Sequence, residues 1–112
     1  MQNTNLIQEI KIGSIRYSIR KVENLRDGND HLFGKVTHSN STIELDASLD
    51  DQQIKQTLWH EIFHVLRVQA GLPYFKLEEQ IAEAFSYGLV GVLQDNPWIL
   101  QEIELADTVK NK

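Results

Sequence analysis

Hydrophobic and polar residues alternate along the first part of the chain, and this pattern predicts β-strands. Ile10 and Ile12 alternate with polar neighbours, and the alternation resumes in a shifted phase at Ile15. The shift falls at Gly13-Ser14, a pair suited to a tight turn. Residues 10–22 are therefore expected to form a β-hairpin.

Two shorter β-rich runs follow, at residues 32–37 and 42–46, on either side of the polar segment 38–41. They predict a second hairpin. Residues 23–30 are polar and end in Asp-Gly-Asn-Asp, a sequence that favours turns, so this segment is expected to be a loop. The two hairpins together predict a small antiparallel sheet of three or four strands.

After residue 48 the spacing of apolar residues changes to one that is typical of helices. No Gly or Pro interrupts residues 51–70, and Ser48 is placed to cap the start of a helix. Gly71 is suited to ending it. The apolar residues expected to form its buried face are Ile54, Leu58, Ile62 and Leu66.

A second helix is predicted over residues 76–94. The turn around Gly71 and Pro73 should fold it back antiparallel to the first helix, and Gly88 and Gly91 are expected to permit close approach of another element. Residues 98–109 also have helical potential. The apolar positions of the second helix recur every four residues, at Leu77, Ile81, Phe85, Leu89 and Leu93.

Composition limits the classes of protein to consider. A chain of 112 residues with 41% hydrophobic and 24% charged residues is expected to form a single α+β domain over residues 1–112, and no apolar run is long enough to cross a membrane. The first residues show no secretion signal, so a cytoplasmic location is expected. The net charge of −5 argues against direct nucleic-acid binding, and the absence of Cys excludes disulfides and thiolate ligands.

The motif that dominates the sequence is His60-Glu61-Ile62-Phe63-His64, an H-E-x-x-H pattern within the first predicted helix. Residues four apart on a helix lie one above the other, so His60 and His64 can bind one metal ion, for which zinc is expected. Glu61 lies about 100° further round the helix and is the candidate general base that holds a metal-bound water. Buried histidines without a metal are the alternative, but each would then need another polar partner.

A catalytic zinc site has three protein ligands, so a further ligand is needed. The second predicted helix offers Glu79 and Glu83 on one face. We assign Glu79 as the third ligand and Glu83 as the hydrogen-bond partner of a ligand histidine, and the choice between the two stays open on the sequence alone. Glu78 is expected to lie on the exposed face of the helix.

These motifs resemble a known family. H-E-I-F-H followed by E-x-x-x-E-x-F-x-x-G-L is similar to metallopeptidases of the ImmA/IrrE type, and specifically to their short phage or mobile-element versions. The resemblance covers about residues 49–97. It implies a minimal zincin-like fold, in which a small antiparallel sheet covers the H-E-x-x-H helix, and a glutamate as third ligand, with Glu79 at the ligand position and Glu83 supporting a histidine. It also implies a repressor or another regulator as the polypeptide substrate.

The expected activity is therefore zinc-dependent hydrolysis of a peptide bond in a protein substrate. The alternative is a binding protein or antirepressor of the same fold that contains the metal but does not cleave. The strand at residues 42–46 is the candidate edge strand for pairing with an extended substrate. Four residues could donate a hydrogen bond to the tetrahedral intermediate: His31, His38, Tyr74 and Tyr87. Of these, His31 and His38 are expected to be exposed loop residues.

Overall fold

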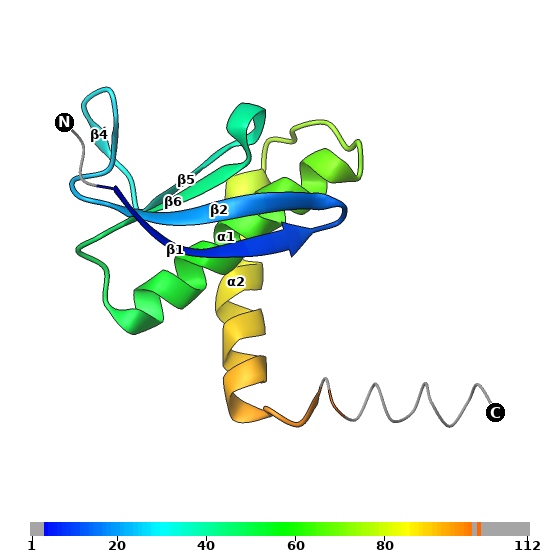
Figure 1. Ribbon diagram of the computed structural model, residues 1–112. Coiled ribbons are helices and arrows are strands. Elements are labelled where there is room, and N and C mark those ends of the chain that lie inside the picture. The colour runs from blue at the N-terminus through cyan, green and yellow to red at the C-terminus, as the bar shows by residue number, and fades with distance from the viewer. Residues whose placement is uncertain (1–3, 100, 102–112) are drawn as a thin grey trace.

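The computed structural model describes residues 4–99 and residue 101, which form a four-stranded mixed sheet, a separate two-stranded ribbon and two long helices (Figure 1). The chain is thus α+β, as predicted. None of the helices in this described part is long and apolar enough to cross a membrane. The elements in chain order are β1 (Thr4–Ile12), β2 (Ile15–Val22), β3 (Arg26–Asp27), β4 (Asp30–His31), β5 (Gly34–Thr37), the 3₁₀ turn η1 (His38–Asn40), β6 (Thr42–Asp46), α1 (Asp51–Gln69) and α2 (Glu78–Asp95).

Both predicted hairpins are present. β1 and β2 pair antiparallel around a turn in which Gly13 has a φ of +63°, a conformation that suits glycine. β5 and β6 pair antiparallel around η1. The segment around residues 23–30, predicted as a loop, includes a short ribbon in which β3 and β4 pair antiparallel.

The expectation of an antiparallel sheet is wrong in one respect, because β2 and β6 pair in parallel. The strand order is β1-β2-β6-β5, so the second hairpin docks on the first through its later strand. This order also makes β6 an interior strand. The prediction that residues 42–46 form an edge strand is therefore wrong, since β5 is the edge on that side of the sheet.

The core lies between one face of the sheet and α1, which crosses that face in Figure 1. Burial of an Ile, Val or Leu side chain stabilises a fold by about 1.5–3 kcal/mol, so this layer fixes the position of α1 on the sheet. The buried residues that form this cluster are Ile12, Tyr17, Ile19, Ile43, Leu45, Ile62 and Val65.

The first helix begins two residues later than predicted, because Asp50 rather than Ser48 caps it. The side chain of Asp50 accepts a hydrogen bond from the Gln53 N–H, and the Gln53 side chain accepts one from the Asp50 N–H. The helix ends as predicted, with Gly71 at a φ of +72°.

The buried face of α1 is only partly the predicted one. Of the four residues expected on that face, Ile62 is buried, Ile54 and Leu58 are partly buried, and Leu66 is 49% exposed. Thr57, Glu61 and Val65 are buried beside Ile62.

The apolar residues that recur every four positions in α2 do not form its buried face. Leu77, Ile81 and Phe85 are each about half exposed. The buried residues are instead spaced by four on a neighbouring face, and they are Glu78, Ala82, Ser86 and Val90. Two of these are small, and small side chains let two helices approach closely, so the larger apolar residues are displaced to the surface.

The glycines of α2 do not have the predicted role within the described residues. Among the described residues, no atom outside the adjacent turns of α2 itself lies within 4 Å of a Cβ built at Gly88 or Gly91. Most of the predicted helix over residues 98–109 lies outside the described residues.

Gly34, by contrast, lies in close contact with α1. A Cβ at this position would lie 2.6 Å from Thr57 Cγ2 and 3.1 Å from Glu61 Oε2. We expect Gly34→Ala to lower the free energy of unfolding by about 1–3 kcal/mol through overpacking. Gly88→Ala, in an open position of α2, should raise it by about 0.5–1 kcal/mol. Urea denaturation measures both; equal stability of Gly34→Ala and the unsubstituted protein would contradict the close packing of β5 on α1.

Candidate metal centre

The centre is built on the middle of α1, where His60 and His64 lie one helical turn apart with their ring centroids at 4.9 Å. The α2 helix folds back antiparallel to α1 and brings its first turns to this point. At the other end of the pair, the side-chain amides of Gln52 and Gln94 are hydrogen bonded to each other. Short turns and antiparallel packing thus place acids of α2 opposite the histidines.

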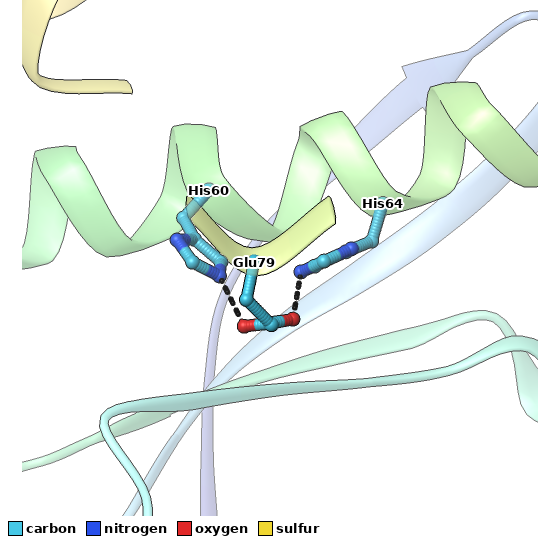
Figure 2. Close-up of side chains that lie close together, drawn as sticks. All are labelled: His60, His64 and Glu79. Carbon is cyan, nitrogen blue, oxygen red and sulfur yellow. Dashed lines mark hydrogen bonds and ion pairs between the residues drawn. The ribbon is translucent and has the colours of Figure 1, made fainter. Parts of the chain in front are cut away.

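Glu79 lies between the two imidazoles, as Figure 2 shows. Its Oε1 atom is 2.8 Å from His64 Nε2, and its Oε2 atom is 3.3 Å from His60 Nε2. One ligand atom from each of the three residues can be chosen so that all three lie within 4.8 Å of one another. The structure therefore brings together the three residues predicted as ligands.

Glu83 occupies a different position. Its Oε2 atom lies 3.2 Å from Nδ1 of His60, on the ring nitrogen that does not face Glu79. A carboxylate beside Nδ1 holds the hydrogen of the neutral ring on Nδ1 and leaves the lone pair on Nε2, the nitrogen that faces Glu79. This arrangement favours Glu79 over Glu83 as the third ligand, with Glu83 supporting His60.

Glu78 contradicts its prediction as a residue of the exposed face. Its side chain is 1% exposed, and its Oε2 atom lies 2.5 Å from His64 Nδ1. The other oxygen, Oε1, is 3.0 Å from Arg67 Nε. Burial alone would raise the pKa of Glu78, but the contacts with His64 and Arg67 outweigh it and lower the pKa.

Glu78 thus supports His64 as Glu83 supports His60. The sequence does contain a signal for its burial. Glu78 shares its spacing of four with Ala82 and Ser86, and small residues in that register mark the face of α2 that packs closest to α1. Because this face carries a charged residue and small residues, the spacing of the large apolar residues does not indicate it.

Glu61 is held in a buried position beside the two histidines, with 7% of its surface exposed. Burial raises its pKa to about 7, and although the nearby His64 lowers the pKa, Glu79 raises it further. Both the protonated and the ionised form are therefore populated near neutral pH. This is the protonation behaviour that a general base and acid needs.

A cavity of about 640 Å³ opens over these residues between β5, α1 and α2. The four candidate donors, His31, His38, Tyr74 and Tyr87, all line it. His38 is exposed, as predicted; its partial burial and the nearby Arg67 and His64 lower its pKa. His31 is also exposed, as predicted, but it lies in β4 rather than in a loop, and it contacts Asp46.

Asp46 ends β6, and its side chain is 1% exposed. Its carboxylate accepts hydrogen bonds from the Leu25 N–H at 2.8 Å, from the Ser48 N–H at 3.1 Å and from the Ser48 hydroxyl, and it lies 3.1 Å from His31 Nε2. Burial alone would raise the pKa of Asp46. The hydrogen bonds from Ser48, Leu25 and His31 outweigh this effect and lower the pKa to about 2.

This low pKa predicts a dependence of stability on pH. Because the pKa of Asp46 in the folded protein lies below its ordinary value of 3.8, its contribution is present above about pH 4 and is lost as the pH falls toward 2. We expect Asp46→Asn to lower the free energy of unfolding by about 2 kcal/mol at pH 6, by a margin that shrinks below pH 4. Denaturant titrations of both proteins from pH 6 downward test this, and a margin that stays constant would contradict it.

The donor set fits a zinc ion. Two imidazole nitrogens and one carboxylate oxygen form the set typical of a catalytic zinc, which keeps a further position open for water. Each histidine also has a carboxylate at its second nitrogen, which holds the imidazole in the tautomer that binds a metal. No family model matches the chain, and no significantly similar curated protein or solved structure was found.

Proposed function

We propose that this chain is a zinc-dependent peptidase that hydrolyses a peptide bond in a polypeptide. The observation that carries the proposal is the position of Glu79 between the Nε2 atoms of His60 and His64, with the buried Glu61 beside them. The resemblance of the motifs to the ImmA/IrrE type supports it, as does a sheet packed on the helix that bears them. A minimal zincin-like fold is part of this proposal.

In this proposal His60, His64 and Glu79 hold the zinc, and Glu83 and Glu78 orient the two imidazoles. When bound, the zinc would polarise the substrate carbonyl and lower the pKa of a water molecule. Within the described part of the chain the group comprises three ligands, which favours a catalytic over a structural site.

Glu61 then acts as the proton carrier. Its carboxylate lies beside the two histidines and can accept a proton from the attacking water. The same carboxyl group can give the proton to the leaving amine. Burial keeps competing solvent away from this carboxyl group.

The proposed substrate is an extended segment of a polypeptide. The edge strand β5 lines the cavity, and its first residue, Gly34, packs against Glu61. A peptide that pairs with this edge through main-chain hydrogen bonds would lie across the metal centre. A repressor or another regulator with an exposed extended segment is the substrate class that the family resemblance favours.

The test uses the full chain and a peptide library made from a whole proteome. Zinc-loaded protein should cleave a subset of peptides at a common sequence, as read by mass spectrometry of new termini. Removal of the metal by a chelator should abolish cleavage, and added zinc should restore it. Cleavage that is indifferent to zinc, or no cleavage of any library peptide, would contradict the proposal.

A further inference from the structure

A second polar pair lies at the same cavity, outside the metal centre. His31 Nε2 is 3.1 Å from Asp46 Oδ1, and the side chain of His31 is 41% exposed. A carboxylate can only accept hydrogen bonds, so the hydrogen of a neutral His31 ring is on Nε2. Its Nδ1 atom then carries the lone pair, and among the described residues it has no hydrogen-bond partner.

The position of the ring places it within reach of a bound peptide. His31 lines the cavity together with Gly34 and Glu61. His31 and Gly34 are three residues apart, so their Cα atoms are separated by at most about 11 Å. Gly34 packs directly on Glu61. Phe33 lies edge-on to the imidazole, with ring centroids 6.4 Å apart, and also lines the cavity.

A purely structural role explains less of this arrangement. Leu25 and Ser48 already donate three hydrogen bonds to Asp46, so the carboxylate has partners without His31. The three bonds from Leu25 and Ser48 fix the position of the Asp46 carboxylate. The carboxylate in turn holds the hydrogen of the neutral His31 ring on Nε2. An orienting carboxylate behind an exposed histidine is the arrangement by which proteins present one ring nitrogen to a ligand.

We propose that His31 is a substrate-binding residue whose Nδ1 atom accepts a hydrogen bond from a main-chain N–H of the peptide in the cavity. Asp46 is the positioning residue that fixes its tautomer. This inference rests on the peptidase function proposed above. It names a contact to the substrate that neither the metal ligands nor the edge strand supplies.

Two substitutions separate binding from structure. In His31→Gln the side-chain amide reaches the place of Nε2, so the bond to Asp46 is kept and the Nδ1 acceptor is lost. In His31→Asn the amide lies at the place of Nδ1, so the acceptor is kept and the bond to Asp46 is lost. The two variants therefore remove the two functions of the ring one at a time.

The experiment measures kcat and KM on the best-cleaved library peptide, together with zinc content and urea stability. One neutral hydrogen bond corresponds to roughly a three- to tenfold change, so His31→Gln should raise KM by that factor with kcat, zinc content and stability unchanged. His31→Asn should lose stability but show a smaller rise in KM. An unchanged KM in His31→Gln, with cleavage by the unsubstituted protein intact, overturns this inference alone, whereas no zinc-dependent cleavage by the unsubstituted protein overturns it together with the peptidase function.

Discussion

Glu61→Gln is expected to reduce peptide cleavage about 10²- to 10⁴-fold while leaving zinc binding and the fold in place. The reason is that Gln has the shape of Glu but cannot accept the proton of the attacking water. Glu61 is the only acid among residues 57–66 and is buried beside both histidines, so no neighbouring acid on that turn of α1 can replace it. Single-turnover cleavage of the best library peptide by zinc-loaded protein measures the loss.

A stability measurement provides the control. In metal-free protein the pKa of Glu61 is raised from 4.5 to about 7, so the folded state is disfavoured as the pH rises through this range. Glu61→Gln should therefore be more stable than the unsubstituted protein by about 3 kcal/mol at pH 8, with no margin below about pH 4.5. Peptide cleavage by Glu61→Gln at the rate of the unsubstituted protein would contradict the role of Glu61. If Glu61→Gln lost cleavage but kept the biological effect of the protein, the alternative of a binding protein or antirepressor would be favoured.

Glu79→Gln should weaken zinc binding by more than a hundredfold, whereas Glu83→Gln should weaken it only about tenfold. Glu79 faces the Nε2 atoms of both histidines, and its replacement removes a ligand. Glu83 contacts only Nδ1 of His60, and loss of such a support costs about 10–100-fold in affinity or activity. Competition with a chromophoric chelator measures both affinities.

The two acids form a matched pair for this comparison. They lie on the same helix, and their side chains are 61% and 59% exposed, so general effects of removing a charge should be nearly equal. Any difference between Glu79→Gln and Glu83→Gln thus reports the position of each carboxylate. If Glu83→Gln weakened zinc binding more than Glu79→Gln, Glu83 would be the ligand, and the assignment from the geometry of the metal centre would be contradicted.

Local patterns predicted most of the secondary structure. The break in alternation at Gly13 located the first hairpin, and Gly71 located the end of α1. The parallel pairing of β2 with β6 was not predictable, because the strands are separated by residues 23–41 and strand alternation carries no information about which edges meet. That pairing made β6 an interior strand and left β5 as the edge beside the metal centre.

For the candidate site, the sequence by itself determined the spacing of His60 and His64 and the place of Glu61 between them, since helical geometry is local. It also indicated acids of the second helix as candidates for the third ligand. Only the tertiary structure decided which acid faces which ring nitrogen. Glu78 became a buried partner of His64, and His31 came to the cavity wall against Asp46, because helix packing and strand order place residues together that no periodicity connects.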